Sequence, residues 1–482
     1  MEYISLKKVH IFFYSKDAKD NYNFLLYKNI SNKKNEENEQ YAHLYNTITQ
    51  SDNGSIYSIS RFLTQNFGNI LTDEFIAKFN KKENMEIKNN FQKLKLYELW
   101  ENDIYTYWLD KLSQNLIQYD EIKEEVIYFL EIPFISIDEF NSLMEKNNLG
   151  MRFIYLNEIN FTSIKLIEET DNIFNIISLP KMKEHVINTI KSKEENKNII
   201  YIILSLKTPG KHQNGFFHFP ALFHSLYRKN NEEWKYNNVS TDGLPSDELL
   251  SKTKAILIPG SNLSVYNDYD FLRKTEVFLK KLINEILFEK KYPNLKILGI
   301  CFGMQIIVSA LGGKISKMKN PPKGTPEQVE IIDEKFYEFS FYKNTGIEKK
   351  KFLKISEAHG DEISEYPEEK YKIKLFGSSK SCKNEIMVDE TEKIFLIQGH
   401  PEYNPEFNSN RVAKFFIKMR LKKEPTNEDI EKFIDNYINN EDAKNVNIEE
   451  YRKMCYYFMI NKYIELIKTK NNLLNENGRG KY

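Results

Sequence analysis

The chain has 482 residues, about three times the usual size of a domain, so its length predicts two or three folding units. Lysine plus arginine and aspartate plus glutamate both total 69, which gives a formal net charge of zero. This balance lacks the basic excess expected of a nucleic-acid-binding protein. With 29% charged and 41% hydrophobic residues, the composition is that of a globular protein rather than a disordered one.

The cysteine content and the first residues bear on the cellular compartment. Only three cysteines occur, Cys301, Cys382 and Cys455, and an odd, small number favours a reducing compartment. Residues 1–8 show neither the apolar core of a signal peptide nor the composition of a transit peptide, so we expect a cytoplasmic protein. Ile297–Gly313 has no charge, but it is short for a membrane span and contains four glycines. We therefore expect a buried strand, turn and helix there, and no membrane insertion.

Residues 1–197 have the mixed pattern of an α+β region whose role the sequence does not indicate. Alternating or continuous apolar runs predict strands at Lys8–Tyr14, Asn23–Leu26, Glu125–Ile137 and Met151–Ile159, with a polar loop at Ser31–Gln40. An apolar residue also recurs every four positions, which predicts one helix with a core-facing stripe formed by Leu96, Trp100, Ile104, Trp108 and Leu112.

A change from a polar to an apolar pattern near residue 198 predicts a domain boundary. The polar stretch Lys191–Asn198 gives way to the apolar run Ile199–Leu204, which is typical of a buried parallel strand. Further strands are expected at Ala255–Ile258, Leu295–Ile300 and Ile394–Ile397, and a helix at Asp270–Leu287. We expect residues 198–424 to form an α/β domain with a doubly wound, mostly parallel sheet.

Residues 425–482 are expected to form a helical C-terminal extension. A cap signal at Thr426 and Asp429 precedes apolar residues at helical spacing up to Ile438. A second helix is expected at Ile448–Lys468, followed by a loose tail from Asn475.

The segment with the clearest chemistry surrounds Cys301. A predicted strand leads into Gly299-Ile300-Cys301-Phe302-Gly303 and then into an apolar helix, the form of a nucleophile elbow with cysteine in place of serine. The glycines suit the sharp turn, because side chains there would collide with neighbouring backbone. A helix N-terminus favours a thiolate, and its N–H groups can bind an oxyanion. Alone, this pattern fits a structural buried cysteine equally well.

A second segment supplies a base. The strand Ile394–Ile397 leads into Gly399-His400-Pro401-Glu402, so His400 can accept the proton of Cys301 and return it to a leaving group. Glu402 can bind the other ring nitrogen of His400 and fix its orientation. Sites of this kind lie at the carboxyl ends of the strands in an open α/β sheet.

Together these two motifs resemble the class I glutamine amidotransferase superfamily with a Cys-His-Glu triad, over about residues 198–418. The resemblance implies Cys301, His400 and Glu402 as catalytic residues. The loop after Ala255–Ile258 is similar to the one that completes the family's oxyanion hole, which implies backbone donors at Gly260, Ser261 and Phe302. Many members have a second glycine where this chain has Ser261, a change that keeps the backbone donor.

The stretch Ala358–Ile363 resembles the family's Ser-His-x-Asp-x-Val segment beside the substrate pocket. That similarity implies substrate contacts for His359 and Asp361, and the elbow helix implies one for Gln305. Ala358 replaces the family's serine, which puts the substrate preference in question. From the residues alone, Asp361 serves equally well as a turn cap.

Within the superfamily the elbow with Met304 resembles the amidotransferase domain of GMP synthase. Four other features look more like the plant-type γ-glutamyl peptidases: Phe302, the His359-x-Asp361-Glu362 segment, the Gly260-Ser261 loop and Ile397–Tyr403. The sequence contains no ATP-pyrophosphatase loop and no Gly-x-x-x-x-Gly-Lys-Ser/Thr phosphate loop, so an ATP-driven synthetase is not expected. The resemblance implies a cysteine hydrolase of glutamine or γ-glutamyl peptides.

Two other functions remain open on the sequence. In the first, the α/β domain is a catalytically idle scaffold in a larger assembly. In the second, it is a glutaminase that feeds ammonia to a separate synthetase. More than half of the chain lies outside the resemblance, so a protein partner is conceivable through residues 1–197 or the C-terminal helices.

No cofactor is expected. His212, His218 and His224 lie close in sequence, but no cysteine or carboxylate spacing completes a metal site, and we predict none. Neither Cys382 nor Cys455 sits in a context typical of a nucleophile.

Overall fold

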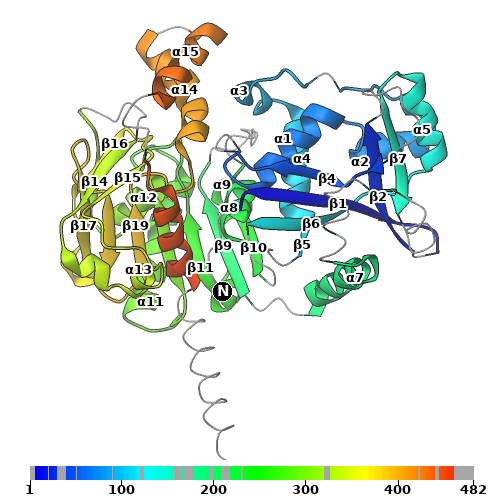
Figure 1. Cartoon of the computed structure of the whole chain (residues 1–482). Helices are drawn as coiled ribbons and strands as arrows, with labels where there is room; N and C mark the ends of the chain where they lie inside the picture. Colours follow the sequence, from blue (N-terminus) through cyan, green and yellow to red (C-terminus); the bar gives the residue numbers. More distant parts are fainter. Residues whose placement is uncertain are drawn as a thin grey trace, which may run out of the picture. The chain divides into compact units, whose positions relative to one another are not determined.

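The structure is a computed structural model, and it describes residues 6–460 apart from 20, 30–39, 50–51, 90, 120–123, 157–164, 167–172, 174–176, 196–198, 208–217, 229–231, 320–325, 422–423 and 440–444. Contacts divide these residues into two compact units, which are described separately (Figure 1). The N-terminal unit lies within Ile4–Lys197 and Gln213–Asn231. The second, called the α/β unit below, lies within Asn198–His212 and Glu232–Tyr482.

The N-terminal unit is built on a mixed sheet in the order β5-β6-β1-β2-β7, with β4 also pairing β1. β1 and β6 run parallel, and the other pairings are antiparallel. Its strands are β1 (Lys8–Lys16), β2 (Tyr22–Asn29), β4 (Leu44–Thr47), β5 (Ile117–Gln118), β6 (Glu125–Glu131) and β7 (Met151–Leu156), while β3 (Gln40–Tyr41) pairs β8 (Lys165–Leu166) separately. Its helices are α1 (Ser55–Phe67), α2 (Asp73–Asn80), α3 (Leu96–Leu99), α4 (Asp103–Asn115), α5 (Ile137–Lys146), α7 (Leu179–Glu195) and α8 (Phe219–Tyr227).

The four predicted strands of this region are confirmed, although the third is shorter than expected. β6 ends at Glu131, and Ile137 already begins α5. Of the fourth, residues 157–159 lie outside the described residues, as do residues 31–39 of the expected polar loop.

The prediction of a single helix around Trp100 is wrong, because the structure has two helices there, α3 and α4. The side chain of Asn102 accepts hydrogen bonds from the backbone N–H groups of Ile104 and Tyr105, so a new helix begins there. The core role of the apolar stripe is confirmed, since its last four members are buried: Trp100, Ile104, Trp108 and Leu112.

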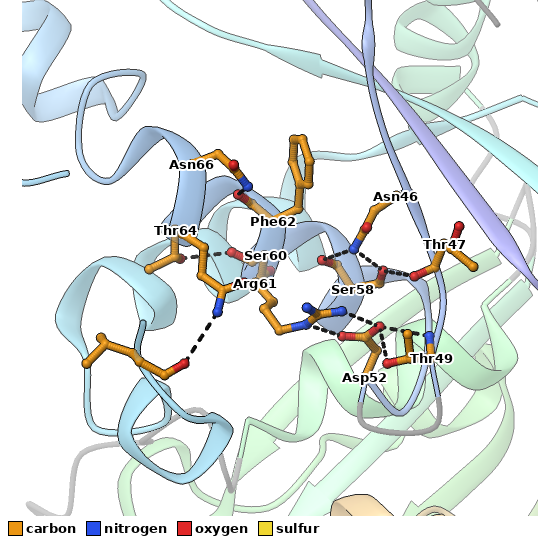
Figure 2. Close-up of polar contacts among 12 residues, drawn as sticks. Asn46, Thr47, Thr49, Asp52, Ser58, Ser60, Arg61, Phe62, Thr64 and Asn66 are labelled. Carbon is orange, nitrogen blue, oxygen red and sulfur yellow. Dashed lines mark hydrogen bonds and ion pairs between the residues drawn. The ribbon is translucent and has the colours of Figure 1, made fainter. Parts of the chain in front are cut away.

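Side-chain hydrogen bonds fix the connection between β4 and α1 (Figure 2). Arg61 Nε and Nη2 donate to the two carboxylate oxygens of Asp52 at 2.6 and 2.9 Å, and the backbone N–H of Thr49 donates to the same carboxylate. Asn46 Nδ2 donates to the hydroxyl and carbonyl oxygens of Ser58. The buried Asp52 therefore has a bidentate partner, the arrangement that best offsets the burial of a charge.

The α/β unit contains a sheet in the order β10-β9-β11-β12-β19-β18-β17-β14-β15 (Figure 1). Its strands are β9 (Ile199–Ser205), β10 (Glu232–Asn238), β11 (Thr253–Ile258), β12 (Lys296–Ile300), β14 (Glu327–Ile331), β15 (Phe352–Ile355), β17 (Ile373–Ser379), β18 (Ile386–Asp389) and β19 (Ile394–Ile397), and β13 (Lys314–Lys317) pairs β16 (Asp361–Glu365) separately. Its helices are α9 (Val239–Asp242), α10 (Asp247–Lys252), α11 (Asp270–Leu287), α12 (Phe302–Ala310), α13 (Ser340–Lys343), α14 (Pro405–Leu421) and α15 (Asn427–Ile438), with 3-10 turns at Glu334–Glu338 and Glu369–Tyr371.

The predicted strands and the helix at Asp270–Leu287 are confirmed, but the sheet is mixed rather than mostly parallel. From β10 to β19 the neighbours run parallel, and from β19 to β15 they run antiparallel. The antiparallel strands were not predicted, because β14, β15 and β17 have mixed burial and β18 has only four residues, so their periodicity is weak.

Helical segments cover both faces of this sheet. On β19, Ile394 and Leu396 belong to the core cluster that also contains residues of α11 and α12. Phe395 points to the opposite face, where its ring lies 4.7 Å from that of Phe341 and 5.4 Å from that of Phe458. Phe458 belongs to a helical segment at 448–460, so part of the expected C-terminal extension packs on the sheet.

The start of the C-terminal extension also agrees with the sequence. Thr426 and Asp429 form the predicted capping box at the start of α15. The second expected helix is described over residues 448–460, and its remainder and the tail lie outside the described residues. None of the described helices has the length and apolar character that a membrane span requires.

Candidate active site

Cys301 sits on a strained turn between β12 and α12. Its backbone has φ 52° and ψ −109°, a left-handed region that side chains rarely adopt, and the residue is the N-cap of α12. A Cβ on Gly303 would lie 1.9 Å from the carbonyl oxygen of Ile258, and one on Gly299 would lie 2.9 Å from the backbone carbonyl carbon of Gly303. The two glycines are therefore required for the reason that the sequence predicted.

His400 and Cys301 converge on the same glycine. β12 and β19 are neighbouring parallel strands, so their carboxyl ends place both residues at one edge of the sheet. A Cβ on Gly260 would lie 3.0 Å from His400 Cε1 and 3.7 Å from Cys301 Cβ. Glu402 Oε1 lies 2.8 Å from His400 Nδ1. Nε2 of His400 is buried and has no hydrogen-bond partner among the described residues, which leaves it available to take a proton.

Burial controls the charge of the two reacting groups. It raises the pKa of the Cys301 thiol, and the negative charges of Glu402 and Glu357 act in the same direction, while Arg411 and the backbone N–H of Phe302 oppose them more weakly. Burial also lowers the pKa of His400, although Glu402 opposes that shift. The resting site is therefore a neutral thiol beside a neutral imidazole. The helix N-terminus acts on the thiol in the predicted direction, but burial outweighs it.

The loop after β11 is held in place by the side chain of Ser261. Its hydroxyl donates to the carbonyl oxygen of Leu206 at 2.7 Å and accepts from the N–H of Leu263 at 3.2 Å. The Ser261 hydroxyl is thus occupied by loop contacts. The resemblance assigns the backbone N–H groups of Gly260 and Ser261, not this hydroxyl, to the oxyanion hole. The backbone N–H of Phe302, on the residue after Cys301, acts to lower the pKa of the Cys301 thiol.

The three residues expected to contact substrate form one connected group. Gln305 Nε2 donates to the carbonyl oxygen of Asp361 at 3.0 Å, and His359 Nδ1 lies 3.0 Å from the same oxygen. The carboxylate of Asp361 accepts from the hydroxyls of Ser264 at 2.6 Å and Tyr266 at 2.8 Å. Asp361 therefore ties the loop that contains Gly260 to β16, a positioning role that the sequence did not indicate.

Two arginines near the His-Pro-Glu segment were not predicted. The guanidinium of Arg411 lies 4.2 Å above the ring of Tyr403, whose centroid is 5.1 Å from that of His400. Arg452 Nε and Nη2 donate to the carbonyl oxygens of Pro401 and Glu402, both at 3.2 Å. The sequence could not have indicated the Arg452 contact, because residues 452 and 402 are brought together only by the packing of the folded chain.

The histidines around residue 218 have structural partners in the N-terminal unit. His218 Nε2 lies 2.7 Å from a carboxylate oxygen of Asp110, and His224 Nδ1 lies 2.8 Å from the carbonyl oxygen of Ser113. His212 lies outside the described residues. Cys382 lies in the loop before β18 and Cys455 in the helical segment 448–460, and both are buried.

Comparison with known proteins identifies the family. The model of the glutamine amidotransferase class-I family matches residues 221–419. Gamma-glutamyl peptidase 4 of Arabidopsis thaliana is 30% identical over 211 residues, which cover 44% of this chain and 77% of that protein. The chain belongs to the class I glutamine amidotransferase family. The resemblance drawn from the motifs is confirmed.

Two other relatives also match less than half of this chain. Gamma-glutamyl peptidase 2 of Arabidopsis thaliana is 31% identical over 192 residues, covering 40% of this chain and 69% of that protein. A GMP synthase [glutamine-hydrolyzing] of Borreliella burgdorferi is 34% identical over 165 residues, covering 34% of this chain but only 27% of the synthase. The similarity to the synthase is thus confined to about a quarter of that enzyme.

Proposed function

We propose that this chain hydrolyses γ-glutamyl amide bonds through a γ-glutamyl thioester on Cys301. The observation that carries the proposal is the strained elbow at Cys301, with His400 contacting the same Gly260 and held by Glu402. Backbone strain of this kind costs about 1–3 kcal/mol and persists where function requires it. Membership in a family with glutaminase activity gives the reaction class.

The first half of the reaction forms the thioester. Nε2 of His400 takes the proton of Cys301, and Sγ attacks the γ-carbonyl carbon. Negative charge that develops on the carbonyl oxygen is stabilised by the backbone N–H groups of Phe302 and of Gly260 or Ser261. The imidazolium, stabilised by Glu402, then donates its proton to the leaving nitrogen as the carbon–nitrogen bond breaks.

The second half releases the acyl group. His400 removes a proton from water, the resulting hydroxide attacks the thioester carbon, and the carbon–sulfur bond breaks. Glutamate leaves, and the sulfur recovers its proton from the imidazolium. Both halves need His400 neutral at the start, which agrees with the direction in which burial moves its pKa.

Two substrate classes fit this chemistry, glutamine and γ-glutamyl peptides. Similarity to the γ-glutamyl peptidases supports γ-glutamyl peptides as the substrate of this chain, and similarity to the GMP synthase supports glutamine. We assign Asp361 and Gln305 to the wall of the substrate pocket, because the Asp361 carboxylate binds the Gly260 loop and its carbonyl oxygen accepts from Gln305 of α12. His359 binds the same carbonyl oxygen and positions that wall from its buried side. We assign the chemistry to a domain of residues 198–424, with residues 1–197 and 425–482 as partner-binding or supporting segments.

Release of glutamate from glutamine and from γ-glutamyl dipeptides tests the proposal. The wild-type chain should release glutamate from at least one of them, and Cys301→Ala should not. Cys455→Ser is the matched control, because it changes a buried cysteine outside the site and should keep the activity. An idle scaffold predicts equal background rates in all three proteins. A glutaminase that serves a separate synthetase predicts activity on glutamine alone.

A further inference from the structure

Four buried side chains behind the catalytic histidine face one another. They are Glu357, His359, Cys382 and Glu385, called the buried quartet below, and the most exposed of them retains 8% of its surface. One ligand atom each of His359, Cys382 and Glu385 lie within 4.8 Å of one another, and Glu357 Oε2 lies 3.2 Å from His359 Nε2. The quartet comes from two separate loops, the one after β15 and the one before β18, so no sequence spacing revealed it.

Among the described residues, one carboxylate oxygen of the quartet has a hydrogen-bond donor, Oε1 of Glu385, which accepts from Ser379 Oγ at 2.5 Å. Nδ1 of His359 lies 3.0 Å from the carbonyl oxygen of Asp361, which can only accept, so Nδ1 carries a proton and Nε2 is the atom that faces the quartet. The nearby Glu357 oxygen is a second acceptor. Both carboxylate oxygens of Glu357, Oε2 of Glu385 and Nε2 of His359 have no hydrogen-bond partner among the described residues. Two buried carboxylates therefore face one imidazole, the one side chain of the quartet that can carry a positive charge, and this shortage of counter-charge is costly in a medium of low dielectric constant.

We propose that the buried quartet binds one divalent zinc-class metal ion. One imidazole, one thiolate and two carboxylates are the donor types that Zn²⁺ takes in proteins, and four protein ligands make a closed, structural site. His359 already has the partner that metal-binding histidines use, a backbone carbonyl on the other ring nitrogen. Ligand atoms around tetrahedral zinc are about 3.5 Å apart, so binding draws these side chains inward by about 1 Å. Cys382 gives its proton to solvent as the ion binds.

A metal ion in the quartet would also fix the position of His400, because the quartet contacts the segment that contains this histidine. The N–H of His400 donates to the carbonyl oxygen of Ser356 at 2.8 Å, and Ser356 is the neighbour of Glu357 in the chain. Glu357 Oε1 packs so closely on Gly399 that a Cβ there would lie 2.4 Å away. A metal ion that holds Glu357 therefore holds the segment on which His400 sits.

The competing arrangement fills the quartet with protons, either on the carboxyl groups or on Nε2 of His359, which then forms an ion pair with Glu357. Burial raises the pKa of Glu357, and Glu327 adds to the shift, while burial and then Glu357 raise the pKa of Glu385. Protons satisfy two carboxyl groups but give Cys382 no role, and they predict a protein that binds no zinc.

Metal content and Co²⁺ spectra separate these arrangements. The test uses the full chain carrying Cys301→Ala, so that the elbow cysteine cannot contribute a thiolate. We expect one zinc per chain by plasma mass spectrometry, and thiolate-to-cobalt charge-transfer absorption after exchange with Co²⁺. Adding Cys382→Ser should remove that absorption and weaken zinc binding by more than the roughly 10- to 100-fold cost of losing an outer-shell partner. Adding Cys455→Ser should change neither.

Two results would overturn the proposal. One is a folded Cys301→Ala protein that binds no zinc at micromolar free metal. The other is zinc binding of equal strength with and without Cys382. Because the first measurement needs no change in the quartet, a variant that fails to fold cannot decide the outcome. The background lacks the catalytic thiol, so the result is also independent of whether the chain hydrolyses γ-glutamyl bonds.

Discussion

Replacing Cys301 by glycine should stabilise the α/β unit relative to replacing it by alanine. Both variants remove the thiol, but alanine keeps a Cβ at φ 52° and ψ −109° and glycine does not. Relief of the strained conformation is worth about 1–3 kcal/mol. The greater flexibility of glycine in the unfolded chain subtracts about 0.5–1 kcal/mol. The net expectation is that Cys301→Gly has a free energy of unfolding about 0–2.5 kcal/mol higher than Cys301→Ala, with a midpoint of about 1 kcal/mol.

Amide hydrogen exchange in β12 and β19 measures this difference, because the slowest amides of a core sheet report the unfolding of their own unit. Ala413→Gly, in the interior of α14, is the matched control at a relaxed helical position. There the glycine should destabilise the protein, by about 0.5–1 kcal/mol from backbone entropy alone. A Cys301→Gly protein less stable than Cys301→Ala by about 0.5–1 kcal/mol, as at a relaxed position, would refute the claim that the elbow is strained.

Four other predictions follow from the site. Gly303→Ala should destabilise the α/β unit by more than 3 kcal/mol, roughly the upper range for single core changes, whereas Gly360→Ala, with no atom within 4 Å of its Cβ, should stay within about 0.5 kcal/mol in thermal unfolding. Glu402→Gln should lower kcat by about 10²- to 10⁴-fold, because it removes the carboxylate that orients His400 and stabilises its imidazolium; an unchanged kcat would exclude that role. The acid limb of a kcat/KM profile should lie below pH 6.5, because a lowered pKa keeps His400 neutral to lower pH; a limb above pH 6.5 would contradict the assignment. Asp361→Asn should lower kcat more than it raises KM if this residue positions the Gly260 loop, and a change in KM alone would instead favour a substrate contact.

The sequence predicted the parts of the site that local backbone geometry dictates. Cys301 between two glycines, and His400 directly after a buried strand, are short motifs whose spacing is set by a turn at the end of a strand. The pairing of β12 with β19 then brings them together, as the parallel arrangement predicted. The residue types that could satisfy this geometry are few, so the motif was informative.

The sequence did not reveal the contacts that depend on long-range packing. Arg452 reaches the carbonyl oxygens of the His-Pro-Glu segment, and Tyr266 reaches Asp361, across 50 and 95 residues of chain. The pKa of Cys301 depends likewise on burial, which a helix N-terminus alone does not disclose. In the N-terminal unit, the cap at Asn102 overrides an apolar repeat that continues through the break.

Covalent labelling of Cys301 by a glutamine-like diazo-ketone tests the central claim most directly. All three cysteines are buried, so Cys382 and Cys455 serve as internal controls for nonspecific alkylation. Peptide mass spectrometry should find the label on Cys301 alone, and excess glutamine or γ-glutamyl dipeptide should slow the labelling. His400→Asn should also slow it, since the thiol then lacks its base. A folded protein that is not labelled at Cys301, or is labelled equally on all three cysteines, would contradict the assignment of Cys301 as the nucleophile of a γ-glutamyl hydrolase.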